Sequence, residues 1–126
     1  MAIRIVRLGS ERKRGEGIRF GTVRRPPRGV PKARHSKENW YDTWLPMLSP
    51  SAELMKSARG GTAWNTFTRR FHAEMKRPDA AHLLNALAAL SHQTNFSVGC
   101  YCEDEEHCHR GILRELLEER GAAIVG

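Results

Sequence analysis

The chain has 126 residues, of which 40% are hydrophobic and 28% charged, and its net charge is +7. This length fits one compact domain over residues 1–126. It has no apolar run long enough to span a membrane, and its first seven residues (M-A-I-R-I-V-R) lack the apolar stretch of a signal peptide. We therefore expect a cytoplasmic protein with reduced cysteines, and three cysteines, an odd number, argue against a disulfide framework.

The pattern of apolar residues predicts an alternation of strands and helices along the chain. Strands are expected at 2–8 and 18–23, followed by a proline-rich loop at 24–37. Helices are expected at 36–48, 50–59, 62–75 and 78–90, then a strand at 96–102, a helix at about 107–120 and a final strand at 122–125. Strands at both ends with helices between them imply crossover connections. We therefore predict an α/β fold with a small, mainly parallel sheet flanked by about five helices.

The excess positive charge lies in the first quarter of the chain. Residues 1–35 hold 11 Lys/Arg and 2 acidic residues, a net charge of +9, whereas the rest of the chain carries −2. Part of this charge is in the loop at 24–37, which three prolines make stiffer than a Gly/Ser linker. Such a concentration favours an acidic partner, either a phosphate-bearing small molecule or a nucleic acid. It would also be compatible with a solvated basic edge that has no partner.

Several motifs occur in a specific order along the chain: P-R-G-V-P-K at 27–32, W-x3-W-L at 40–45, L-S-P-S-A-E-L at 48–54, A-W-N-T-F-T-R-R-F-H-A-E-M at 63–75, and C-x7-C-H-R from Cys100. In these motifs the chain resembles the YeaO-like proteins, domain-of-unknown-function family 488. The resemblance implies a small α/β domain, and the family has no settled activity to transfer. One departure is T-V-R-R-P at 22–26, where relatives look more like D-R-L-W-P.

The window at 100–110 (C-Y-C-E-D-E-E-H-C-H-R) contains all three cysteines and lies where a strand ends and a helix begins. Ligands of open α/β sheets usually bind at such junctions. Backbone N–H groups at a helix start stabilise anions and lower the pKa of thiols. We therefore predict a pocket for a small anionic ligand, phosphorylated or nucleotide-like. Its predicted residues are Cys108 and His109 as reacting groups and Cys100, Arg110, Arg25, Arg28 and Lys32 as binding groups.

Other interpretations of this window stay open. Residues 107–114 fit H-C-x-x-G-x-x-R, the phosphate loop of cysteine phosphatases, but four carboxylates at 103–106 separate that motif from the strand. A zinc site could form from Cys100, Cys102, Cys108 and His107 or His109. The basic first quarter could bind nucleic acid, and the cysteines could be buried residues without a chemical role. The sequence does not decide whether the protein is an enzyme, and it names no cofactor.

Overall fold

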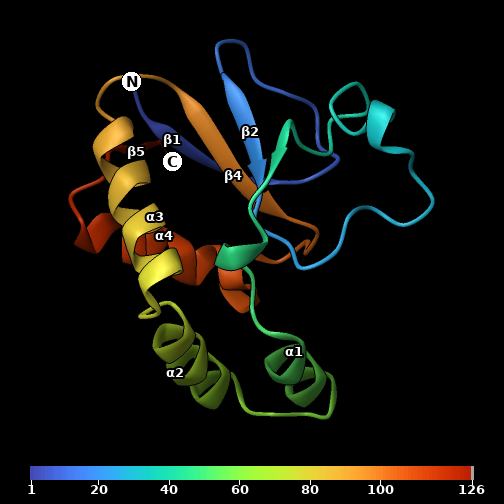
Figure 1. Cartoon of the computed structure of the whole chain (residues 1–126), viewed down its shortest axis with the longest axis vertical. Helices are drawn as coiled ribbons and strands as arrows, with labels where there is room; N and C mark the ends of the chain where they lie inside the picture. Colours follow the sequence, from blue (N-terminus) through green and yellow to red (C-terminus); the bar gives the residue numbers. More distant parts are fainter. Residues whose placement is uncertain (126) are drawn as a thin grey trace.

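Five strands form one sheet in the order β3-β2-β4-β1-β5, and each neighbouring pair runs parallel (Figure 1). The computed structural model describes residues 1–125. The strands are β1 (Ile3–Arg7), β2 (Ile18–Gly21), β3 (Thr43–Trp44), β4 (Phe96–Cys100) and β5 (Ile124–Val125). The predicted α/β class with a mainly parallel sheet is therefore confirmed.

Four α-helices complete the described part of the chain: α1 (Ala52–Arg59), α2 (Trp64–Glu74), α3 (Pro78–Leu90) and α4 (His109–Glu119). Helices α3 and α4 pack together against the sheet, whereas α1 and α2 lie beyond the carboxyl ends of β2 and β4 (Figure 1). Within residues 1–125, no helix combines the length and apolar character needed to cross a membrane. This arrangement places the end of β4, the start of α4 and α1 around the same end of the sheet.

Alternation along β2 and β4 places the main apolar core on one face of the sheet, whereas the other face carries a buried polar group beside a second apolar cluster. Phe20 and Phe96 belong to the main core, with their rings edge to face at 5.8 Å. The intervening residues Arg19 and Ser97 are fully buried and both bond to the Glu16 carboxylate, which is 2.8 Å from Arg19 Nε. A buried ionic network thus holds the loop after β1 onto this second face of the sheet.

The helix predicted at 36–48 is wrong, and it accounts for the difference between about five helices expected and four found. Asn39 adopts a φ of 62°, which a right-handed helix cannot contain. Asp42 accepts hydrogen bonds from the Ser36 hydroxyl at 2.5 Å and from the Arg12 guanidinium at 2.8 and 2.9 Å. These side-chain bonds favour a turn. The chain then continues as β3 and a short 3-10 turn, Pro46–Leu48.

Several predicted element ends differ from those in the structure. The strand expected at 96–102 ends at Cys100, and the last helix begins at His109. Ser51 caps α1 by accepting from the Leu54 N–H, so that helix begins two residues later than expected. Because β4 is shorter than predicted, Cys102 lies in a loop beyond the strand.

Candidate functional site

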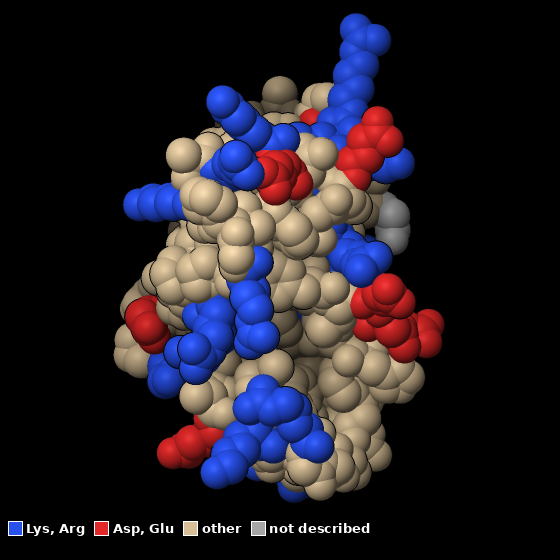
Figure 2. Space-filling model, turned by 90° about the vertical axis from the view of Figure 1, so that its right-hand side faces the viewer, with Lys and Arg blue, Asp and Glu red and all other residues tan. Residues whose placement is uncertain are grey.

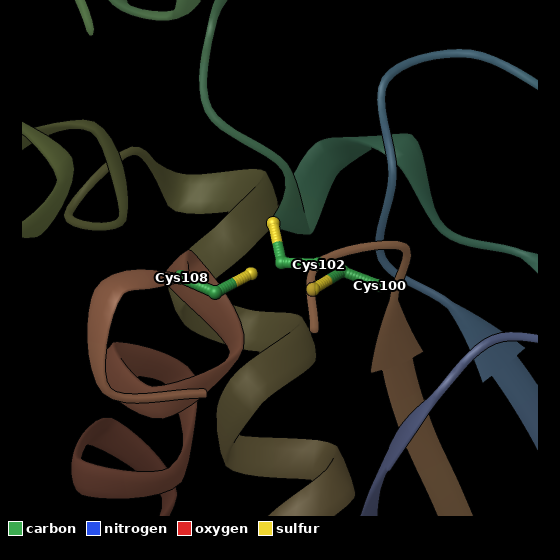
Figure 3. Close-up of side chains that lie close together, drawn as sticks. All are labelled: Cys100, Cys102 and Cys108. Atoms are coloured by element: carbon green, nitrogen blue, oxygen red, sulfur yellow. The ribbon is translucent and has the colours of Figure 1, made fainter. Parts of the chain in front are cut away.

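The three cysteines gather between the end of β4 and the start of α4 (Figure 3). Their sulfur atoms all lie within 4.8 Å of one another, and we call this group the thiol cluster. Cys100 is the last residue of β4 and is 1% exposed, and Cys108 immediately precedes α4 and is 3% exposed. Cys102, in the loop between them, is exposed. The cluster therefore has two buried thiols and one that solvent can reach.

The loop of the thiol cluster is held by its acidic residues. Glu105 is paired with Arg114 at 2.6 Å, and Asp104 with His107 at 2.8 Å. A Cβ on Gly111 of α4 would lie 2.4 Å from the Glu105 carbonyl oxygen, so the close packing of the loop on the helix requires glycine there. The phosphatase interpretation gains no support, because Arg114 is directed to Glu105 and does not share a pocket with the cysteines.

His109 is buried beside Cys108, and its orientation is set by one backbone group. Its Nε2 lies 2.5 Å from the Thr22 carbonyl oxygen, which can only accept a hydrogen bond, so Nε2 carries the proton. In the neutral ring the Nδ1 lone pair then faces Cys108 Sγ at 3.7 Å. Burial lowers the pKa of His109, which favours this neutral form.

Arg110 is 5% exposed and binds backbone carbonyl groups. Its two terminal nitrogens each donate at 3.2 Å, one to the Val6 carbonyl in β1 and the other to the Glu103 carbonyl in the loop. Its Nε has no hydrogen-bond partner among residues 1–125. Arg110 therefore joins β1 to the cysteine loop and is not among the side chains that line the cavity described below.

The thiols of the cluster influence one another's ionisation. Hydrogen bonds from Cys100 and Cys108 lower the pKa of Cys102 well below its usual value. The hydrogen bond to Cys102 raises the pKa of Cys100 to about 11, and hydrogen bonds to Cys100 and Cys102, together with burial, raise that of Cys108. These shifts favour the thiolate form at Cys102, the exposed member of the cluster, over that form at the two buried thiols.

A cavity of about 320 Å³ lies beside the thiol cluster. Cys100, Cys102 and His109 line it together with Arg24, Arg25 and Arg59, and we call it the arginine–thiol cavity. None of these three arginines forms an ion pair within residues 1–125. Figure 2 shows Lys and Arg side chains on both sides of a hollow in this region. The cavity therefore joins uncompensated positive charge to the thiol cluster.

A family model described as "DUF488-N3a: Active DUF488-N3 subclade" matches residues 3–121. The chain belongs to the DUF488 family. The resemblance to the YeaO-like proteins is thereby confirmed, and the match includes the thiol cluster and every residue that lines the cavity. No curated protein and no solved structure matches the chain. The family assignment supplies no reaction or ligand for this DUF488 protein.

The structure places the predicted basic residues of this DUF488 protein in different positions. Arg25 lines the arginine–thiol cavity, but Lys32 lines a second hollow together with Trp44, and Arg28 is exposed and lines neither. Arg59 was not predicted, although it contributes to the same cavity as Arg25. No local motif marks Arg59, because only the packing of α1 below the sheet brings it there.

Proposed function

We propose that this DUF488 protein binds a small anionic ligand, phosphorylated or nucleotide-like, in the arginine–thiol cavity. The observation that carries this proposal is the position of Arg24, Arg25 and Arg59 around one cavity without ion-pair partners among the described residues. Its volume of about 320 Å³ lies at the lower end of the usual range for small-molecule sites. The word "active" in the description of the subclade agrees with a working site, but it names no chemistry.

The arginines suit phosphate or carboxylate groups by geometry as well as by charge. Each guanidinium presents a planar fork of donors that can bind two oxygens at once. Arg24 is partly oriented already, because its Nε donates to the Pro50 carbonyl at 2.9 Å. A ligand held by these forks would lie in the same cavity as the exposed thiol of Cys102.

Four of the eleven Lys and Arg residues in the first quarter of the chain form ion pairs within the described residues. The pairs are Arg7 with Glu103, Arg12 with Asp42, Arg19 with Glu16 and Arg34 with Glu38. A nucleic acid needs a continuous series of available cations along its phosphates. The local group of arginines at the cavity therefore favours a small ligand over a nucleic acid.

Thermal unfolding in the presence of phosphate, sulfate and nucleotides tests this proposal, because a ligand that binds only the folded state raises Tm. The variant is Arg59→Gln, and the matched control is Lys56→Gln, which removes the same charge from α1 but does not line the cavity. A chelator and a reducing agent keep metal ions and oxidation out of the measurement. We expect at least one anion to raise Tm in the parent and the control, and to do so much less in Arg59→Gln. An unchanged parent, or an equal response in Arg59→Gln, would refute the proposal.

A further inference from the structure

We propose that Cys100, Cys102 and Cys108 form a binding site for a thiophilic divalent cation, of which zinc is the best match. The proposal stands on the geometry of the thiol cluster and is independent of the anionic ligand. Thiolate sulfur is a preferred ligand of zinc, and three cysteines with one nitrogen are a known ligand set for it.

The distances within the cluster are close to those of a zinc site. A tetrahedral zinc with sulfur at about 2.3 Å separates neighbouring sulfurs by about 3.8 Å. The three sulfurs already lie within 4.8 Å of one another, so the remaining contraction is about 1 Å or less. In Figure 3 the side chains of Cys100 and Cys108 extend into the space between β4 and α4, with the Cys102 sulfur beside them. Cys102 is exposed, so its side chain can make most of the adjustment.

The surrounding structure holds the ligands in place before any metal binds. Cys100 ends a buried strand, and Cys108 immediately precedes a helix that packs on the core. The loop between them is fixed where Arg110 donates to the Glu103 carbonyl and Arg114 pairs with Glu105. Such preorganisation reduces the conformational entropy that metal binding must overcome.

His109 is the candidate for a fourth protein ligand, because its ring lies beside Cys108. Its Nδ1 lies 3.7 Å from Cys108 Sγ, close to the separation of about 3.6 Å expected between nitrogen and sulfur ligands of one zinc ion. Its Nε2 donates to the Thr22 carbonyl, the kind of bond that metal-bound histidines usually make with their second nitrogen. Nδ1 is not within 4.8 Å of all three sulfurs, so a shift of this ring would have to accompany its binding.

The charges near the cluster are compatible with a metal–thiolate centre. Binding of one divalent cation by three thiolates leaves the centre with a charge of −1, and each cysteine that is still protonated releases its proton on binding. The adjacent Arg110 is buried and positively charged, and its Nε has no partner among residues 1–125. A negative centre beside Arg110 would therefore compensate a buried cation.

The test uses reduced, tag-free protein that is supplied with zinc, desalted and analysed for metal content. A second readout is the absorption of the cobalt form, in which thiolate ligands produce charge-transfer bands. Cys102→Ser is the informative variant, because the residue is exposed and the substitution should not disturb folding. His82→Asn, an exposed histidine on α3, is the control.

We expect one zinc per chain and thiolate-to-cobalt bands in the parent and in His82→Asn. Cys102→Ser should bind zinc about tenfold more weakly or worse, since it loses a direct ligand. A parent that retains no zinc and shows no thiolate bands, or a Cys102→Ser variant that binds like the parent, would overturn the metal site. The anion response measured with chelator is a separate result, so either proposal can fail without the other.

Discussion

The buried pair of Glu16 and Arg19 predicts how the stability of the protein depends on pH. The two side chains are 2% and 0% exposed, and the Glu16 carboxylate also accepts from the Ser97 hydroxyl at 2.6 Å and the Lys13 N–H at 3.1 Å. Burial alone raises the pKa of Glu16, but the hydrogen bonds from Arg19, Ser97 and Lys13 outweigh burial and lower it to about 2. The folded state thus binds the Glu16 proton less readily than the unfolded chain.

The lowered pKa corresponds to a definite contribution to stability. A fall from 4.5 to about 2 represents about 3 kcal/mol of unfolding free energy. Because the folded pKa is lowered, this contribution is present above about pH 5 and is lost as the pH falls toward about 2. Glu16→Gln should therefore destabilise the protein at pH 7 by about 3 kcal/mol, in line with the cost of leaving a buried charge unpaired.

Urea unfolding at pH 7 and pH 3 provides the assay. Parent and Glu16→Gln are compared with Glu11→Gln, which removes an exposed acid from the same loop. The parent and the control should both lose stability between pH 7 and pH 3, whereas Glu16→Gln should start lower and change less. If Glu16→Gln lies within about 1 kcal/mol of the parent at pH 7, as surface substitutions do, the buried pair does not stabilise the fold as argued.

Two further predictions concern Arg110 and the cysteines of the thiol cluster. Arg110→Lys should lower the unfolding free energy by about 1–3 kcal/mol, because lysine lacks the planar fork with which arginine donates to the Val6 and Glu103 carbonyls together. Phosphate should still raise the Tm of this variant. A normal Tm with a lost phosphate response would instead make Arg110 a ligand residue. In reduced, metal-free protein, iodoacetamide should modify Cys102 before the buried Cys108, as peptide mass spectrometry can show, and faster labelling of Cys108 would contradict the assigned exposure.

Local patterns in the sequence were sufficient to predict the class of fold. Alternating apolar residues marked the strands that became β1, β2 and β4, and proline at 78 marked the start of α3. The same reasoning failed at 36–48, where Trp40, Trp44, Leu45 and Leu48 have helical spacing. There the positive φ of Asn39 and the hydrogen bonds of Asp42 to distant Arg12 determine the conformation. Bonds between segments so far apart leave no local signal.

The candidate site was predictable only in part for the same reason. The window at 100–110 was recognisable because its cysteines are close in sequence, and the structure brings all three sulfurs together. Which thiol is exposed depends on where β4 ends, and the sequence placed that end two residues too late. Lys32, which the sequence suggested as a binding residue, lines the second hollow, whereas Arg59 lines the arginine–thiol cavity. The sequence could not show this, because the positions of α1 and the basic loop depend on tertiary packing.

Amide NMR spectra recorded during a phosphate titration locate a bound anion directly, and so they test whether the arginine–thiol cavity is its site. We expect saturable shifts for residues that line the arginine–thiol cavity, including Arg25, Arg59 and Cys102. We expect little change for the second hollow, which contains Lys32 and Trp44. Shifts confined to that second hollow, or no saturable shift at the cavity, would contradict a ligand site beside the thiol cluster.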